Sequence, residues 1–181
     1  MKNILSNILI CTLLLASLAW ANSNETIRIR AVGDIMLGTS TPDGFLRPEA
    51  KGSILTYIRP VLLDADLTLG NLEGTLCDSG VTDKCEPDSL DCYLFKMPEI
   101  YGQDLKDAGF DFISLANNHV GDFGPECGIR TETILDSLGI GWSGRPQSYA
   151  SKMVQGVRVA FLAFHSGGNC NSSLNLESAS A

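Results

Sequence analysis

Positive charge is scarce in this chain. Its 181 residues include 13 Lys and Arg against 21 Asp and Glu, so the formal net charge is −8. The Lys and Arg residues form no cluster along the sequence. Because nucleic acid binding needs concentrated Lys and Arg against the phosphates, this composition argues against a nucleic acid partner. An acidic chain remains compatible with cation binding.

Histidines and closely spaced cysteine pairs are also scarce. The chain has two histidines, His119 and His165. It contains no Cys-x-x-Cys pair, although thiolate zinc sites usually contain such pairs. The cysteines therefore favour structural disulfides over a thiolate metal site, and a zinc site is the alternative.

Three of the cysteines lie close together in the sequence. Cys77, Cys85 and Cys92 fall in a stretch rich in Gly, Pro, Ser and Asp, which indicates a loop. In an oxidising compartment we expect a local disulfide within this loop. Cys127 and Cys170 bring the number of cysteines after residue 21 to an odd five, which leaves one thiol unpaired or paired beyond the end of the chain.

The first 21 residues predict a signal peptide. Lys2 precedes an almost unbroken apolar run over 4–18, and Ala19-Trp20-Ala21 resembles a cleavage site. An uncleaved anchor is the alternative, but the run is shorter than the ~20 residues of a stable membrane span. Cleavage would leave 160 residues (181 − 21) and, with Lys2 removed, a charge of −9. We expect an exported protein, periplasmic or extracellular, with a short leader at 22–26 and one domain.

The pattern of apolar residues predicts alternating strands and helices. Proline at the start and glycine at the end mark two of the helices. We expect strands at 27–32, 66–70, 110–116, 140–142 and 157–164, and helices at 53–63, 98–108 and 125–138. This order predicts an α/β fold with a mainly parallel sheet flanked by helices.

Polar side chains follow several of the predicted strands, where ligands gather in open α/β sheets. Each also has an ordinary explanation: Asp34 as a cap or turn residue, Glu73 as a solvated carboxylate, His119 as a structural histidine. Together they form a mixed oxygen and nitrogen donor set, which suits Mn, Fe, Zn or Mg. The full set at the strand ends is Asp34, Asn71, Glu73, Asn117, Asn118, His119, Asp122 and His165.

Three segments resemble motifs of the CapA family, the capsule or poly-gamma-glutamate biosynthesis proteins. They are Gly33-Asp34-Ile35-Met36-Leu37-Gly38, Gly70-Asn71-Leu72-Glu73-Gly74, and Ala116-Asn117-Asn118-His119 followed by Asp122-Phe123-Gly124. The resemblance spans 27–164. That family is similar in fold to the calcineurin-like metallophosphoesterases. It therefore implies a partial four-layer α/β-β/α sandwich over 27–165, with two divalent metal ions in a complete protein, and an irregular tail over 166–181.

The resemblance also implies roles for individual residues. Asp34, Asn71 and Glu73 would line the metal site, and Asn118 would be the metal-binding asparagine. His119 would contact the substrate phosphate or protonate the leaving group, with Asp122 orienting its ring. His165 is a further candidate ligand, or a residue that only packs at a strand end.

The sequence departs from the phosphoesterase pattern at three points. Met36 stands where a histidine is usual, and a thioether is a poor ligand for hard divalent ions. Glu73 stands where an aspartate is usual. The later histidine loops of the family have no counterpart, so we expect a truncated domain with an incomplete site.

The function implied by the resemblance is a role in capsule or poly-gamma-glutamate biosynthesis, as a metal-dependent, phosphoesterase-like hydrolase. Its substrate would be an anionic polymer or a phosphoester. A non-enzymatic subunit of a surface-polymer assembly complex is the alternative, with membrane polymer-synthesis proteins as partners. A secreted, disulfide-bound domain with neither role is the third interpretation.

Overall fold

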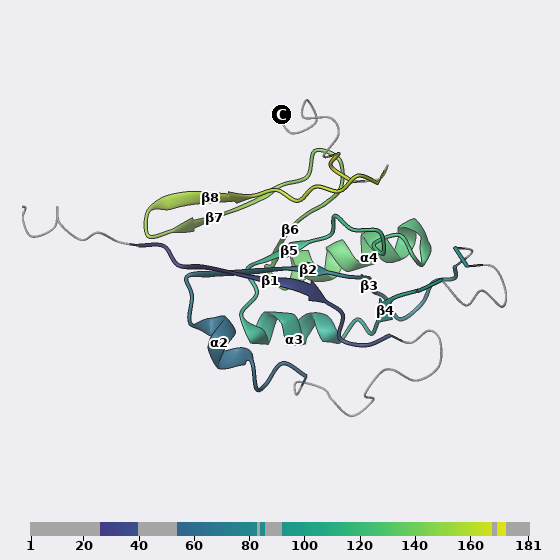
Figure 1. Cartoon of the computed structure of the whole chain (residues 1–181), viewed down its shortest axis with the longest axis horizontal. Coiled ribbons are helices and arrows are strands. Elements are labelled where there is room, and N and C mark those ends of the chain that lie inside the picture. The colour runs from purple at the N-terminus through teal and green to yellow at the C-terminus, as the bar shows by residue number, and fades with distance from the viewer. Residues whose placement is uncertain (1–25, 40–53, 83, 86–91, 168–169, 173–181) are drawn as a thin grey trace, which may run out of the picture.

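A four-stranded parallel sheet forms the centre of the molecule, in the order β1-β2-β5-β6 (Figure 1). The computed structural model describes residues 26–39, 54–82, 84–85, 92–167 and 170–172, so the predicted signal peptide and most of the leader lie outside the described residues. The strands are β1 Ile29–Ile35, β2 Leu67–Leu72, β5 Phe112–Ser114 and β6 Gly141–Ser143. The predicted α/β fold with a mainly parallel sheet is confirmed.

Helices pack against this sheet, and the first two described lie on one of its faces (Figure 1). They are α2 Arg59–Leu63, α3 Tyr101–Ala108 and α4 Gly124–Ser137. Fully buried leucines from the sheet and the helices meet in one core, and each contributes about 1.5–3 kcal/mol by leaving water. This core contains Ile35, Leu62, Leu72, Leu76, Met97, Tyr101, Leu105, Ala108, Phe110, Ile113, Leu115, Ile134, Leu135 and Ile140.

The helix predicted at 53–63 is shorter in the structure. Residues 54–58 form turns, and α2 begins at Arg59 with Pro60 in its first turn. Proline has no N–H to donate and clashes with the preceding turn, so it is accommodated at a helix start and not in the interior. The predicted end of α3 is confirmed, because Gly109 adopts φ 92° and its N–H closes the last turn.

The predicted strand over 157–164 is shorter and lies outside the main sheet. It forms β8, Val157–Phe161, which pairs antiparallel with β7, Ala150–Val154, a strand that the sequence pattern had not indicated. Gln155 and Gly156 both adopt positive φ, as a tight two-residue hairpin turn requires. The hairpin lies across the sheet from α2 and α3 (Figure 1), and its Phe161 stacks on Phe112 of β5 with ring centroids 5.4 Å apart.

Within the described part of the chain, no helix has both the length and the apolar character needed to cross a membrane.

Candidate functional site

A row of polar residues crosses the carboxyl end of the sheet. Asp34 is paired with Asn71, Asn71 with Ser114, and Ser114 with Ser143, one residue from each strand. β1 was predicted to end before Gly33 but continues to Ile35 through an irregularity in its pairing with β2. Asp34 is therefore a direct neighbour of Asn71 in the sheet, and not a loop residue beyond it.

Asn71 joins the two carboxylates of the predicted metal site. Its Nδ2 donates to Asp34 Oδ1 at 2.8 Å and to Glu73 Oε2 at 2.7 Å. Its Oδ1 accepts a hydrogen bond from Asn117 Nδ2 at 3.1 Å. One amide thus holds two negatively charged groups close together and links them to the loop after β5.

The two consecutive asparagines of that loop have different environments. Asn117 is buried, its Nδ2 donates to Leu72 O at 2.8 Å, and its Oδ1 accepts from the backbone N–H of His119 at 2.9 Å. Asn118, the residue that the resemblance placed as a metal ligand, is exposed. The structure therefore brings Asn117 into the network of Asp34, Asn71 and Glu73. Two adjacent asparagines in the sequence gave no signal of which one faces inward.

His119 lies between two carboxylates. Its Nδ1 is 2.7 Å from Asp122 Oδ2, and its Nε2 is 3.8 Å from Glu73 Oε1. A carboxylate only accepts hydrogen bonds, so Nδ1 carries the hydrogen and Nε2 is directed to Glu73. The ring also packs against Phe95, with centroids 4.3 Å apart. The predicted pairing of Asp122 with His119 is present in the structure.

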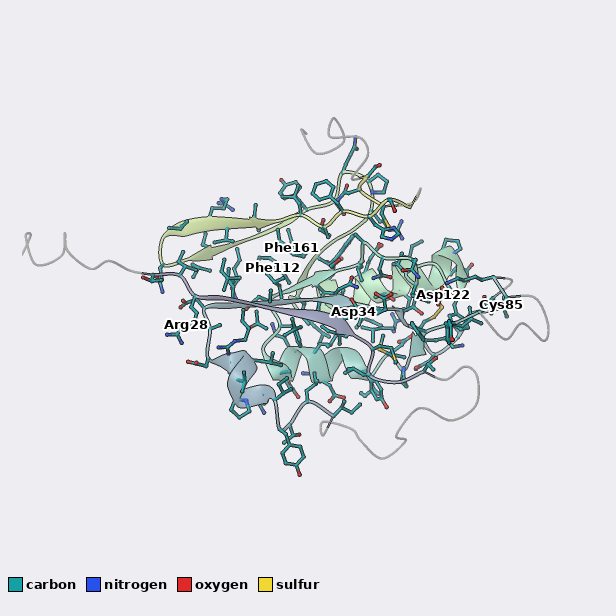
Figure 2. The ribbon with its side chains drawn as sticks, in the orientation of Figure 1. Arg28, Asp34, Cys85, Phe112, Asp122 and Phe161 are labelled. Carbon is teal, nitrogen blue, oxygen red and sulfur yellow. A yellow bond between two sulfur atoms is a disulfide. The ribbon has the colours of Figure 1, made fainter. Side chains whose placement is uncertain are left out.

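Asp122 is completely buried and receives donors from three segments. Besides His119, the backbone N–H of Phe95 donates to its Oδ2 at 2.8 Å, and Lys84 Nζ forms an ion pair with its Oδ1. The short parallel strands β3, Thr75–Leu76, and β4, Lys96–Met97, bring Phe95 to this position. The sequence indicated neither Lys84 nor Phe95. Figure 2 shows Asp34, Asp122 and Cys85 toward the same end of the sheet.

His165 belongs to a separate group of contacts beyond β8. Its Nδ1 accepts a hydrogen bond from the backbone N–H of Gly167 at 2.9 Å. Among the described residues, no hydrogen bond or ion pair in the structure joins it to Asp34, Asn71 or Glu73.

Asn171 holds the segment after β8 in place. Its buried side-chain amide donates to Ser143 Oγ, Ser148 O and Ala163 O at 3.0–3.3 Å, and its Oδ1 accepts from the backbone N–H of Gln147 at 2.7 Å. The described part of the predicted irregular tail is thus packed against the end of β6. The sequence pattern did not single out Asn171.

The cysteines form two disulfides in the described structure. Cys85 pairs with Cys92, which confirms a local disulfide in the predicted loop. Cys77 instead pairs with Cys127, 50 residues away, and joins the residue after β3 to α4. Cys170 is free and buried, and burial raises the pKa of its thiol. A buried thiol with a raised pKa is a poor nucleophile.

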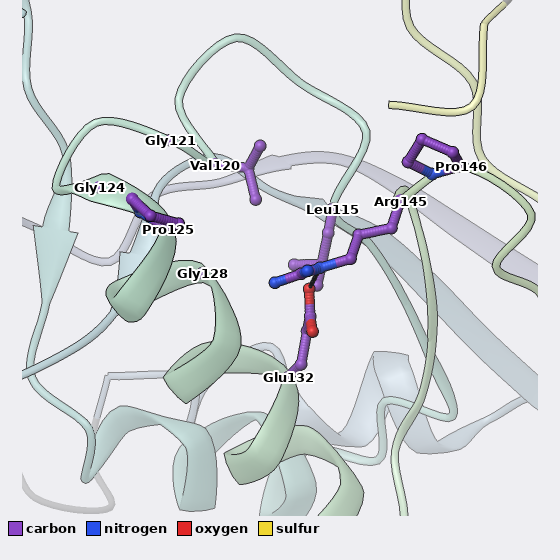
Figure 3. Close-up of a pocket in the computed structure, with 9 residues that line it drawn as sticks. All are labelled: Leu115, Val120, Gly121, Gly124, Pro125, Gly128, Glu132, Arg145 and Pro146. Carbon is purple, nitrogen blue, oxygen red and sulfur yellow. Dashed lines mark hydrogen bonds and ion pairs between the residues drawn. The ribbon is translucent and has the colours of Figure 1, made fainter. Parts of the chain in front are cut away.

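A cavity of about 460 Å³ lies on the other side of the His119 loop (Figure 3). Val120 and Gly121 line it from that loop, and Gly124, Pro125 and Gly128 line it from the first turns of α4. Arg145 reaches across it to form an ion pair with Glu132. Burial raises the pKa of Glu132, and the Arg145 guanidinium opposes this shift.

The donors around Asn71 suit a divalent ion in their chemistry. Asp34 and Glu73 offer hard oxygen atoms, and His119 offers an imidazole nitrogen, which together match Mn, Fe, Zn or Mg better than a thiolate site would. Within the described ranges, however, no three His, Cys, Asp or Glu side chains are grouped so that they could hold an ion. An ion at this place would therefore take further ligands from amide oxygens, water or substrate.

Comparisons with known proteins agree with the resemblance in the motifs. The chain is 29% identical over 148 residues to the capsule biosynthesis protein CapA of Bacillus anthracis, which covers 78% of this chain and 35% of that protein. It is 26% identical over 180 residues to the PGA biosynthesis protein CapA of Bacillus subtilis, covering 90% of this chain and 46% of that protein. An uncharacterised protein of Sinorhizobium fredii is 33% identical over 140 residues, covering 74% and 29%.

The chain thus spans less than half the length of these relatives. The family model described as bacterial capsule synthesis protein PGA_cap matches residues 28–180, which includes every strand and helix described above. The chain therefore belongs to the PGA_cap family of bacterial capsule synthesis proteins.

Proposed function

We propose that this chain contributes a metal-dependent, phosphoesterase-like hydrolytic site to an exported protein of capsule or poly-gamma-glutamate biosynthesis. One observation carries the proposal: a single amide, Asn71, holds the carboxylates of Asp34 and Glu73 together, and Glu73 faces the Nε2 atom of His119. Acidic oxygens and an imidazole nitrogen converge here at the carboxyl edge of the sheet, where α/β proteins bind ligands.

Each residue of the site has a distinct chemical task. Asp34 and Glu73 would hold a divalent ion, and Asn71 keeps their carboxylates in position. When bound, such an ion would polarise a substrate oxygen and lower the pKa of a bound water. His119 would exchange a proton with the substrate or leaving group at Nε2, because its Nδ1–H is committed to Asp122.

The two disulfides support export. Disulfides form and persist in oxidising compartments, so their presence fits a periplasmic or extracellular location. An anionic polymer or a phosphoester remains the proposed substrate, in keeping with a site that would present metal cations to negative groups.

Titration of Mn²⁺ into the purified chain tests the site directly, with the binding affinity measured by calorimetry. We expect Asp34→Ala and Glu73→Ala each to weaken Mn²⁺ binding by at least ~10-fold. Asp107→Ala, which removes an exposed carboxylate on α3, is the matched control and should leave the affinity unchanged. If wild-type protein takes up neither Mn²⁺ nor Zn²⁺, the proposed metal site does not exist.

Hydrolysis of a chromogenic phosphodiester is the second readout. We expect His119→Ala to lower kcat by about 10²–10⁴-fold, the usual contribution of a general acid or base. Equal rates for the wild-type and His119→Ala proteins would exclude a proton-transfer role for the imidazole.

A non-enzymatic role in a polymer assembly complex is the second candidate. The lack of a three-residue ligand group within the described structure favours it. Co-purification with membrane polymer-synthesis proteins separates the two candidates: association that persists in Asp34→Ala and His119→Ala proteins supports the assembly role, and loss of association in both argues against it.

A further inference from the structure

Lys84, which immediately precedes the Cys85–Cys92 disulfide, reaches the His119 site. Its Nζ pairs with Asp122 Oδ1, donates to Asn118 O at 3.3 Å and lies 3.4 Å from His119 Nδ1. We propose that Lys84, held in place by the Cys85–Cys92 disulfide, is a positioning residue that fixes Asp122 and, through it, the ring of His119. This inference deepens the proposed function and rests on His119 being the group that transfers protons.

Burial of Asp122 explains why a cation is needed. Its side chain has no exposed surface, and a buried carboxylate is strongly unfavourable unless charges and hydrogen bonds compensate it. The two oxygens divide the donors: Lys84 takes Oδ1, while His119 Nδ1 and the Phe95 N–H share Oδ2. With Oδ1 bound by the ammonium group, the carboxylate cannot turn, and Oδ2 stays directed at the imidazole.

The lysine and the imidazole do not compete with each other. An ammonium group only donates hydrogen bonds, and the Nδ1 atom of His119 also donates, so both are directed to the carboxylate between them. Lys84 thereby reinforces the arrangement in which Nδ1 carries the hydrogen and Nε2 is directed to Glu73. The side chain of Lys84 is about one-third exposed, so packing around it holds it only in part. Its contact with Asp122 therefore depends on the position of the Lys84 backbone.

The Cys85–Cys92 disulfide supplies that backbone restraint. Lys84 belongs to no helix or strand, but it immediately precedes Cys85. Cys92 lies three residues before Phe95, whose N–H binds the same carboxylate. The disulfide therefore ties together two segments that both donate to Asp122, and Cys92 Sγ lies 3.9 Å from the carbonyl oxygen of Lys84.

The histidine content of the chain makes a direct spectroscopic test possible. With only His119 and His165 present, nitrogen NMR of the imidazole rings of the full chain gives two sets of signals, which His165→Gln assigns. We expect Lys84→Met to shift the His119 ring signals and to leave those of His165 in place. Lys84→Arg, which keeps a cation at this position, should restore most of the wild-type spectrum.

Lys152→Met is the matched control. It removes an ion pair between Lys152 of β7 and Asp111, the residue before β5. It should leave both histidines unchanged. His119 signals of Lys84→Met that superimpose on the wild-type signals would overturn the proposal. So would an equal shift in the Lys152→Met protein, because the effect would then not be specific to Lys84.

A double variant, Cys85→Ser with Cys92→Ser, tests the role of the disulfide. Removing both cysteines by mutation leaves Cys77–Cys127 intact, which chemical reduction would not. We expect the His119 signals to move in the same direction as in Lys84→Met. A double variant with wild-type His119 signals would show that the disulfide does not hold Lys84.

Activity then separates this inference from the proposed function. If the chain hydrolyses the chromogenic phosphodiester, Lys84→Met should lower kcat by about 10- to 100-fold, as loss of a group supporting a catalytic residue does, with KM little changed. If the chain binds no metal and hydrolyses nothing, the proposed function fails, while the NMR comparison still decides whether Lys84 positions His119. Unchanged kcat in an active Lys84→Met protein would overturn the positioning role.

Discussion

The two histidines of the chain lie in contrasting regions. His119 is buried in a loop whose polar side chains bond to Asn71 of β2, to Phe95 just before β4 and to Lys84 just before the Cys85–Cys92 disulfide. His165 follows the exposed hairpin of β7 and β8, and its ring nitrogen bonds to Gly167, two residues along the chain. The contrast shows that two histidines that each follow a strand can differ in whether distant segments of the chain converge on the imidazole ring. In the region after β8, Asn171 and not His165 makes the long-range contacts.

Loss of the Cys77–Cys127 disulfide, which lies in the region of His119, should give the largest effect. Because this disulfide closes a span of 50 residues around the His119 loop, Cys77→Ala with Cys127→Ala should lower the free energy of unfolding by about 4 kcal/mol in the chain-entropy description. Removal of Cys85–Cys92, which spans 7 residues, should cost about 2 kcal/mol. Urea unfolding measures both, and equal losses would contradict the dependence on span.

Loss of the Asp122 carboxylate should come next. Asp122→Ala leaves the Lys84 ammonium, the Phe95 N–H and the His119 ring without their acceptor. Lys84 is partly exposed and can bind water instead, so we expect a loss of about 3 kcal/mol, the lower end of the range for breaking a buried pair. Asp107→Ala, on the exposed face of α3, should change the free energy of unfolding by less than ~0.5 kcal/mol. Similar losses in the two variants would contradict the role of burial.

Asn171 should matter more than His165 for the region after β8. Asn171→Ala removes the side-chain donor to Ala163 O and the acceptor of the Gln147 N–H, and a buried group left unpaired costs about 1–3 kcal/mol. His165→Ala should cost less in the same urea experiment, because its ring is only partly buried. A greater loss in His165→Ala would reverse our interpretation of this region.

Glu132, in the cavity beside the His119 loop, should give a small effect that depends on pH. Since burial raises its pKa above the 4.5 of the unfolded chain, the folded protein binds more protons, and stability is lost as the pH rises through this window. The stability of the wild-type protein relative to Glu132→Gln should therefore fall between pH 4 and pH 7. Urea midpoints of both proteins at the two pH values measure it, and a rise would contradict the sign.

The smallest effect should be that of His165 on metal binding. Because the structure joins His165 to no member of the Asp34, Asn71 and Glu73 group within the described ranges, His165→Ala should leave Mn²⁺ affinity unchanged. The same calorimetric titration with Asp34→Ala is the positive control. A weaker affinity in His165→Ala would restore His165 to the set of proposed ligands.

The sequence by itself determined the local elements and the kinds of donor available. Alternation and helical spacing predicted the strands of the main sheet, Gly109 predicted the end of α3, and the motifs around Asp34, Asn71 and His119 indicated the family. These features depend on residues close together in the chain, which is why local patterns predict them.

Only the tertiary structure decided which side chains meet. It placed Asn117 inward and Asn118 outward, joined Cys77 to Cys127, and brought Lys84 to Asp122. It also turned the last strand into a hairpin outside the main sheet, through the positive φ angles at Gln155 and Gly156. Such contacts arise from packing between distant segments, and burial of a charge such as that of Asp122 selects its partners only once those segments have come together.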